Sequence, residues 1–221
     1  MSQNLFALLL GIIGFFLILS LLARKVTQSK FRHYARISPG DGLSGKEFVE
    51  RVIEAEELRE ISLGKAKGAF SGSYSLSEDR VIVPNPEESS LLSLGISAHE
   101  LGHAEQVKGQ KSLMKVVALL ERFGLILSYI FPLFLIVGFI LYFPLVYLGL
   151  GSYLVILLIC LLELPLEINA SRRALIYLEQ YTKLTEEELH RLKKLLGLAI
   201  LSRLTYITVG YFNLIDFDSE R

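Results

Sequence analysis

The chain has 221 residues, of which 52% are apolar and 21% are charged, and its formal net charge is zero. This composition excludes an ordinary soluble domain, and the neutral balance gives no general indication of nucleic-acid binding. The single cysteine, Cys160, excludes an internal disulfide and a CxxC metal site.

The first predicted element is a transmembrane anchor, which we place in residues 1–24. Residues 5–23 carry no charge and are long enough to cross a bilayer as a helix. No Lys or Arg precedes this run and no small-x-small pattern follows it, so a cleaved signal peptide is excluded. The basic residues that follow favour a cytoplasmic position for the flank: Arg24, Lys25, Lys30, Arg32 and Arg36.

A polar segment over residues 25–120 predicts a helix, a β-hairpin and a second helix. Ser44 and Glu47 have the spacing of a capping box at the start of the first helix. In residues 61–86 two short β-like runs flank a Gly/Ser-rich bend, which predicts the hairpin. From residue 87 to residue 108 the apolar spacing is again helical.

Two further apolar blocks, 123–142 and 145–162, predict a transmembrane hairpin within residues 121–166. A charged segment, 167–194, follows this hairpin. The remaining residues, 195–221, are expected to hold a last transmembrane helix and a short tail.

The positive charges indicate how these spans are oriented. Of 23 Lys and Arg residues, 15 lie in 24–122 and six in 168–194, while the turn between the second and third spans has none. Four spans, with both polar segments on the cytoplasmic side, satisfy this distribution. Arg203 interrupts the fourth block, so it either snorkels, pairs with a carboxylate, or marks an interfacial helix.

The stretch SAHELGHAEQ, residues 97–106, carries the clearest chemical signal. In a helix His99 and His103 share one face and can direct both imidazoles at one metal ion. Zinc lowers the pKa of a water bound to it, and Glu100 would take the proton as that water attacks a peptide carbonyl. Gly102 would allow close approach of another segment on the opposite face. The alternative is a solvent-exposed helix with two unpaired histidines.

A catalytic zinc needs a third protein ligand. The remaining histidines, His33 and His190, lie in ordinary charged surroundings. In LLELPLEINASRRAL, residues 161–175, Glu163 and Glu167 are carboxylates at the edge of hydrocarbon, where an unpaired charge is costly. Glu167 is the favoured ligand; pairing of these acids with nearby arginines is the alternative. Candidates for orienting the ligands are Asn169, Arg172 and Arg173.

Taken together, SAHELGHAEQ and LPLEINASRRAL resemble the bacterial membrane zinc metallopeptidases of the YugP type. The resemblance covers residues 20–210 and implies one zinc per chain on His99, His103 and Glu167, with Glu100 as the catalytic acid and base. The ExNAS run is also similar to the third-ligand block of the HtpX-related membrane peptidases. The family's His-Tyr-Asp run is here GSYSLSED, so only Tyr74 is left as a substrate or oxyanion candidate.

We therefore expect a mainly α-helical integral membrane protein of the cell membrane with about four transmembrane helices. A cytoplasmic α+β metallopeptidase unit would hold the HExxH helix and a small β-hairpin. The predicted function is zinc-dependent endopeptidase activity at the cytoplasmic membrane surface, acting on peptides or membrane proteins, with the lipid bilayer as a partner and no nucleic acid.

Two other functions are open at this level. A site-2-type intramembrane protease would need the HELGH helix to span the bilayer, but the apolar run before it is short and charges follow it. A non-enzymatic scaffold or chaperone, in which zinc only stabilises the fold, would not need an acid such as Glu100 beside the metal. The sequence does not indicate the oligomeric state.

Overall fold

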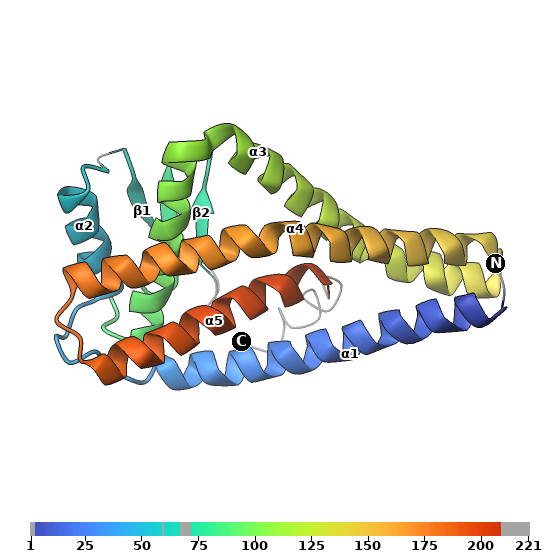
Figure 1. Ribbon diagram of the computed structural model, residues 1–221, viewed down its shortest axis with the longest axis horizontal. Coiled ribbons are helices and arrows are strands. Elements are labelled where there is room, and N and C mark those ends of the chain that lie inside the picture. Colours follow the sequence, from blue (N-terminus) through green and yellow to red (C-terminus); the bar gives the residue numbers. More distant parts are fainter. Residues whose placement is uncertain (1–2, 59, 67–71, 209–221) are drawn as a thin grey trace. The chain divides into compact units, whose positions relative to one another are not determined.

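The computed structural model describes residues 3–58, 60–66 and 72–208. These residues form five helices: α1 (Gln3–Tyr34), α2 (Gly45–Ala55), α3 (Leu91–Ile140), α4 (Pro144–Tyr181) and α5 (Glu186–Thr208) (Figure 1). The strands are β1 (Ser62–Lys65), β2 (Ser73–Ser75) and β3 (Arg80–Val83). The expectation of a mainly helical chain with a small sheet is therefore confirmed.

Three helices in the described part of the chain are long and apolar enough to cross a membrane. They are Gly11–Tyr34 in α1, all of α3, and all of α4. These correspond to the first three apolar blocks of the sequence. The described part of the fourth block lies in α5, which is not among the three, and residues 209–215 of that block lie outside the described residues. A four-span architecture thus stays a prediction.

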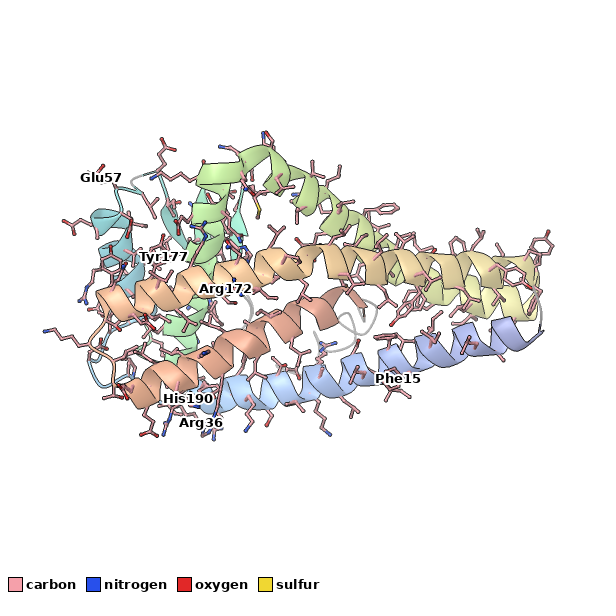
Figure 2. The ribbon with its side chains drawn as sticks, viewed as in Figure 1. Phe15, Arg36, Glu57, Arg172, Tyr177 and His190 are labelled. Carbon is pink, nitrogen blue, oxygen red and sulfur yellow. The ribbon has the colours of Figure 1, made fainter. Side chains whose placement is uncertain are left out.

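One compact unit combines residues 1–25, 116–164 and 201–221, as far as they are described. Its buried core joins apolar residues of α1, α3 and α4: Ile13, Phe131, Val146, Leu150, Tyr153, Ile156 and Cys160. Around this core large apolar side chains are exposed, such as Phe15 at 61% and Ile140 at 74% (Figure 2). A surface this apolar suits lipid better than water.

The second compact unit combines residues 26–115 and 165–200. Its core collects buried side chains from α2, β3, the first part of α3, the end of α4 and the start of α5. Helix α2 begins with the predicted capping box: the Ser44 side chain accepts from the Glu47 N–H, and the Glu47 carboxylate accepts from the Ser44 N–H. Phe48, Val49 and Val52 of this helix are fully buried. This part of the prediction is confirmed.

The sheet differs in detail from the predicted hairpin. Its order is β1-β3-β2, with β1 parallel to β3 and β2 antiparallel to β3. The two β-like runs, which were expected to pair as a hairpin, are therefore parallel neighbours. The hairpin that exists is β2–β3, because the Gly/Ser-rich bend itself supplies β2 and Asp79, at φ 44°, closes the turn. Parallel strands need a long crossover, and this segment provides it.

Two predicted boundaries fall within α3 and α4, although α3 consists of two helical segments joined at a kink. Helix α3 joins the HELGH segment to the second apolar block and changes direction at Gln110, where φ is −143° and ψ is 47°. Helix α4 continues from the third apolar block through Pro165 into the ExNAS segment. Glu163 and Glu167 are therefore placed by one helix that begins in the apolar block.

Candidate metal centre

His99, Glu100 and His103 lie in the first part of α3, and the four-residue spacing places both imidazoles on one face. The ring centroids are 4.8 Å apart and the ring planes are nearly perpendicular. The other face of this segment is fixed in the core of the second unit, where Ala98 and Leu101 have no exposed surface. Core packing therefore determines how the two histidines are presented.

Glu167 meets the two histidines from α4. Its Oε2 lies 3.2 Å from His99 Nε2, and its Oε1 lies 3.6 Å from His103 Nε2. One potential ligand atom from each of the three residues lies within 4.8 Å of those of the other two. The three side chains therefore converge on one small volume, and Glu167 is only 5% exposed.

The two distances between a histidine nitrogen and a Glu167 oxygen are close to those expected around a zinc ion. Ligands about 2.0–2.1 Å from a tetrahedral zinc lie about 3.3 Å from one another. The two measured nitrogen–oxygen separations bracket this value. The set of two imidazoles and one carboxylate is also the donor set of catalytic zinc sites, which leave a fourth position open.

Glu163 does not belong to this group. It lies one helical turn before Glu167 on α4 and is 5% exposed, but its carboxylate is outside the set of converging ligand atoms. Of the two carboxylates that the sequence offered, the geometry assigns the third position of the group to Glu167.

Gly102 brings α3 and α4 close together at this point. A Cβ atom on residue 102 would lie 2.4 Å from the carbonyl oxygen of Ala170 and 3.0 Å from its carbonyl carbon. The close approach that was expected on the opposite face is therefore made toward the helix that carries Glu167. Without a side chain at residue 102, the two helices can approach closely enough for the carboxylate to reach both imidazoles.

Polar side chains contact Nδ1 of each imidazole, whereas Nε2 faces Glu167. Ser171 Oγ lies 3.2 Å from His99 Nδ1, and Gln106 Oε1 lies 3.0 Å from His103 Nδ1. Gln106 also donates to Asn169, which in turn accepts from Arg173. Sequence reasoning had chosen Asn169 and Arg173 for such contacts but had missed Gln106 and Ser171. For Gln106 the signal was available, because it lies three residues after His103 and so on the same face.

Glu100 is buried beside the group but is not one of its three ligands. It is 6% exposed, and a Cβ atom on Gly72 would lie 2.9 Å from its Oε1. The segment just before β2 therefore passes directly over this carboxylate. A buried acid beside three converging ligand atoms is the arrangement needed to move a proton near a metal.

A family model described as "Putative neutral zinc metallopeptidase" matches residues 9–217. The chain belongs to this family. It is also similar to "Putative membrane protease YugP" from Bacillus subtilis (strain 168), with 27% identity over 206 residues and 90% of each chain covered. No solved structure matches the chain.

These comparisons confirm the resemblance drawn from the two sequence blocks. Membership of this zinc metallopeptidase family implies zinc, and the group of His99, His103 and Glu167 could bind such an ion. The similarity to a membrane protease and the three apolar helices indicate membrane association.

Tyr74, the remaining substrate candidate, forms a hydrogen bond with the turn between β2 and β3. Its hydroxyl donates to Asp79 Oδ1 at 2.7 Å, and the ring packs against the core of the second unit. Burial and this hydrogen bond raise the pKa of the Tyr74 hydroxyl. The phenol therefore stays neutral, and its proton is directed at Asp79.

Other polar candidates lie outside the group. Arg172 is on the exposed side of α4, and His190 is exposed on α5 (Figure 2). His33 is exposed near the end of α1. The side chain of Arg203 lies outside the described residues.

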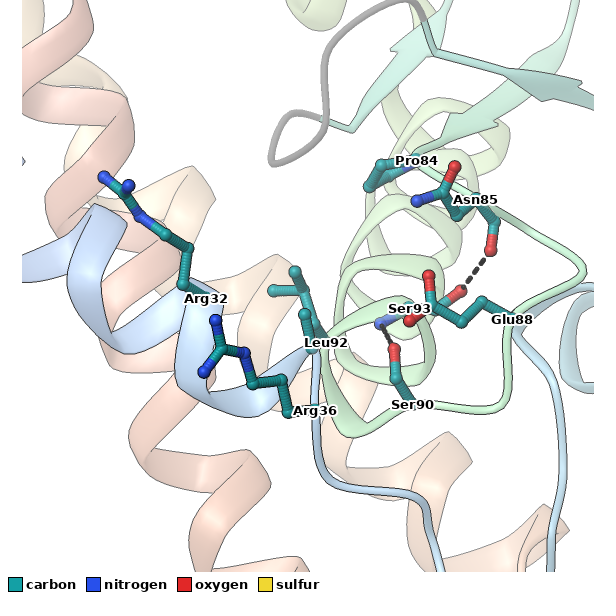
Figure 3. Close-up of a pocket in the computed structure, with 9 residues that line it drawn as sticks. Arg32, Arg36, Pro84, Asn85, Glu88, Ser90, Leu92 and Ser93 are labelled. Carbon is teal, nitrogen blue, oxygen red and sulfur yellow. Dashed lines mark hydrogen bonds between the residues drawn. The ribbon is translucent and has the colours of Figure 1, made fainter. Parts of the chain in front are cut away.

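A separate cavity of about 290 Å³ lies near the start of α3, and no member of the ligand group lines it (Figure 3). Arg32 and Arg36 of α1 contribute to its wall. Its serine hydroxyls serve the start of the helix: Ser90 Oγ accepts from the Ser93 N–H, and Ser93 Oγ donates to the carbonyl of Asn85. These contacts cap α3 and stabilise the segment that carries the histidines.

Proposed function

We propose that the chain is a multi-pass membrane zinc endopeptidase whose active site lies at the cytoplasmic surface of the membrane. The observation that carries the proposal is the convergence of His99, His103 and Glu167 with Glu100 buried beside them. A site that only braced the fold would be completed by a fourth protein ligand. Here Glu100, the buried acid beside the group, stands outside the ligand set.

In the proposed reaction the two Nε2 atoms and the Glu167 carboxylate would hold the ion. When bound, zinc supplies Lewis-acid polarisation of the peptide carbonyl and makes water acidic enough to ionise near neutral pH. Glu100 accepts the proton of the attacking water and then donates it to the amine that leaves. The burial of Glu100 strengthens its interaction with that proton, because few water molecules compete for it.

The proposed depth follows from the continuity of α4. Glu167 lies five positions after Leu162, the end of the apolar run, which is about 7–8 Å along a helix. The ligand group would then lie within two turns of the hydrocarbon edge. The charge distribution favours the cytoplasmic side, because the turn between α3 and α4 carries no Lys or Arg. Substrates would be membrane-protein segments or peptides close to the bilayer.

The first experiment compares the wild-type protein with Glu100→Gln, both purified in nanodiscs. We expect about one zinc per chain in each protein by elemental analysis, and cleavage of an unfolded reporter protein only by the wild type. Retention of cleavage by Glu100→Gln would overturn the proposed mechanism. If both proteins contained zinc but neither cleaved any member of a broad peptide library, the non-enzymatic scaffold would be favoured instead.

The second experiment tests the orientation. Cys160 is replaced by Ser, and single cysteines are placed at Ser77 in the β2–β3 turn or at Tyr142 between α3 and α4. A membrane-impermeant maleimide should label the residue-142 cysteine on intact cells and the residue-77 cysteine only after permeabilisation. The reverse pattern would place the site on the outer side.

A further inference from the structure

Gln106 makes three polar contacts that join the two helices of the ligand group. Its Oε1 lies 3.0 Å from His103 Nδ1 within α3. Its Nε2 donates to the carbonyl of Leu166 at 2.8 Å and to Asn169 Oδ1 at 3.0 Å, both on α4. The residues on α4 flank Glu167 on either side along the chain. One amide side chain, 7% exposed, thus connects a histidine of the group to the helix of the carboxylate.

The direction of these hydrogen bonds can be worked out from groups that have only one role. A guanidinium can only donate, so the atom of Asn169 that faces Arg173 Nε at 2.9 Å must be its oxygen. That same oxygen faces Gln106 and therefore requires the NH₂ end of its amide. The carbonyl of Leu166 is also only an acceptor and requires the same end. Two independent acceptors therefore fix the Gln106 amide in one orientation.

This orientation determines the state of the His103 ring. With its NH₂ group turned to α4, Gln106 presents its oxygen to Nδ1, and an oxygen acceptor requires a hydrogen on that nitrogen. A neutral imidazole with hydrogen on Nδ1 has its lone pair on Nε2. Nε2 is the atom of His103 that faces Glu167.

At His99 the partner of Nδ1 imposes no equivalent constraint. Ser171 Oγ lies 3.2 Å from His99 Nδ1, and a hydroxyl can donate or accept. The series of hydrogen bonds with fixed donors and acceptors therefore acts on His103 and not on His99. It is anchored at Arg173, which forms an ion pair with Glu105, and Glu105 accepts a 2.7 Å hydrogen bond from Tyr177.

We propose that Gln106 is a positioning residue that holds His103 in the Nδ1–H tautomer, with its own amide oriented by Asn169 and Arg173. It thereby offers the Nε2 lone pair to the metal beside Glu167. The proposal rests on the metal site of the proposed function, but it adds a residue and a role that the sequence blocks do not assign.

The test uses full-length protein in nanodiscs with ¹⁵N-labelled histidine. Gln106→Met keeps the length of the side chain and removes the acceptor, whereas Gln106→Glu keeps an acceptor oxygen for the Nδ1 hydrogen. Gln180→Met makes the same change at an exposed position of α4 and serves as the matched control. The imidazole ¹⁵N shifts of zinc-free protein report the tautomer, and competition with a chelator reports the affinity for Zn²⁺.

We expect the wild type and Gln180→Met to show the Nδ1–H form of His103. Gln106→Met should show a mixture of tautomers and bind Zn²⁺ about 10–100-fold more weakly, which is typical for loss of an outer partner of a ligand. Gln106→Glu should restore the Nδ1–H form, because its carboxylate still accepts the Nδ1 hydrogen although it loses the donor to Leu166 and Asn169.

Three outcomes would overturn the proposal: an unchanged tautomer in Gln106→Met, unchanged Zn²⁺ affinity in Gln106→Met, or no recovery of the Nδ1–H form in Gln106→Glu. If the wild type bound no Zn²⁺, the proposed function would fail instead. The tautomer measurement would still decide what Gln106 does to the ring, because it needs no metal.

Discussion

Replacement of Gly102 by Ala tests whether the close contact of α3 and α4 creates the ligand group. The added Cβ would lie 2.4 Å from the Ala170 carbonyl oxygen. Ordinary carbon–oxygen contacts are about 3.3–3.6 Å, so the helices must separate locally by about 1 Å. The obstructing atoms belong to the backbone, so no rotation of a side chain can relieve the clash.

A separation of this size acts on both stability and metal affinity. Overpacking of a tight contact costs about 1–3 kcal/mol. A functional group must be held within about 0.5 Å of its productive position, and Glu167 lies on the displaced helix. We therefore expect Zn²⁺ to bind at least about tenfold more weakly to Gly102→Ala, which corresponds to about 1.4 kcal/mol of binding free energy.

Gly109→Ala is the matched control, because residue 109 lies on the same helix and nothing approaches its Cβ position within 4 Å. The assays are chelator competition for Zn²⁺ and thermal unfolding of both variants in nanodiscs. Wild-type zinc affinity in Gly102→Ala would refute the idea that this contact sets the position of Glu167. Equal losses in both variants would assign the effect to the helix and not to the contact.

Four further outcomes are expected. Gly72→Ala should lower the cleavage rate while zinc content stays near one per chain, because its Cβ would crowd the side chains of Ile96 and Glu100. Ser171→Ala should weaken Zn²⁺ binding less than Gln106→Met does, since its 3.2 Å contact to His99 leaves the tautomer open; an equal or larger loss would contradict this order. Ser44→Ala should cost about 1 kcal/mol of stability through loss of the α2 cap, with unchanged specific cleavage per folded molecule. Removal of zinc should lower the unfolding temperature, because an ion at a thousand times its Kd stabilises the folded state by about 4 kcal/mol; an unfolding temperature independent of zinc would count against a resident metal.

The sequence predicted the parts of this molecule that depend on short-range patterns. The four-residue spacing of His99 and His103 places two imidazoles on one face of any helix, and Ser44 with Glu47 forms the capping box that their spacing indicates. The first three apolar blocks likewise lie in helices that could cross a membrane. In each case the pattern and the structure it produces lie within a few residues of each other.

The features that the sequence could not determine depend on pairing between distant segments. Strand β1 lies parallel to β3 on one edge and β2 lies antiparallel to β3 on the other, and no local pattern distinguishes this order from a simple hairpin. Glu163 and Glu167 have the same residue type and differ by one turn, so only the packing of α4 against α3 distinguishes them. Gln106 gains its role only when Leu166 and Asn169 are placed opposite it.

Glu100 and Glu167 are both buried carboxylates, and the candidate metal centre gives them different surroundings. Taking a carboxylate out of water costs several kcal/mol, and the cost is offset only by specific partners. Glu167, equally buried, faces two imidazole nitrogens and so belongs to a ligand set that stabilises its charge. Glu100 stands beside that set without joining it, on a helix whose other face is fully packed with apolar side chains. The proposed proton transfer would give this buried carboxylate a role beside the group.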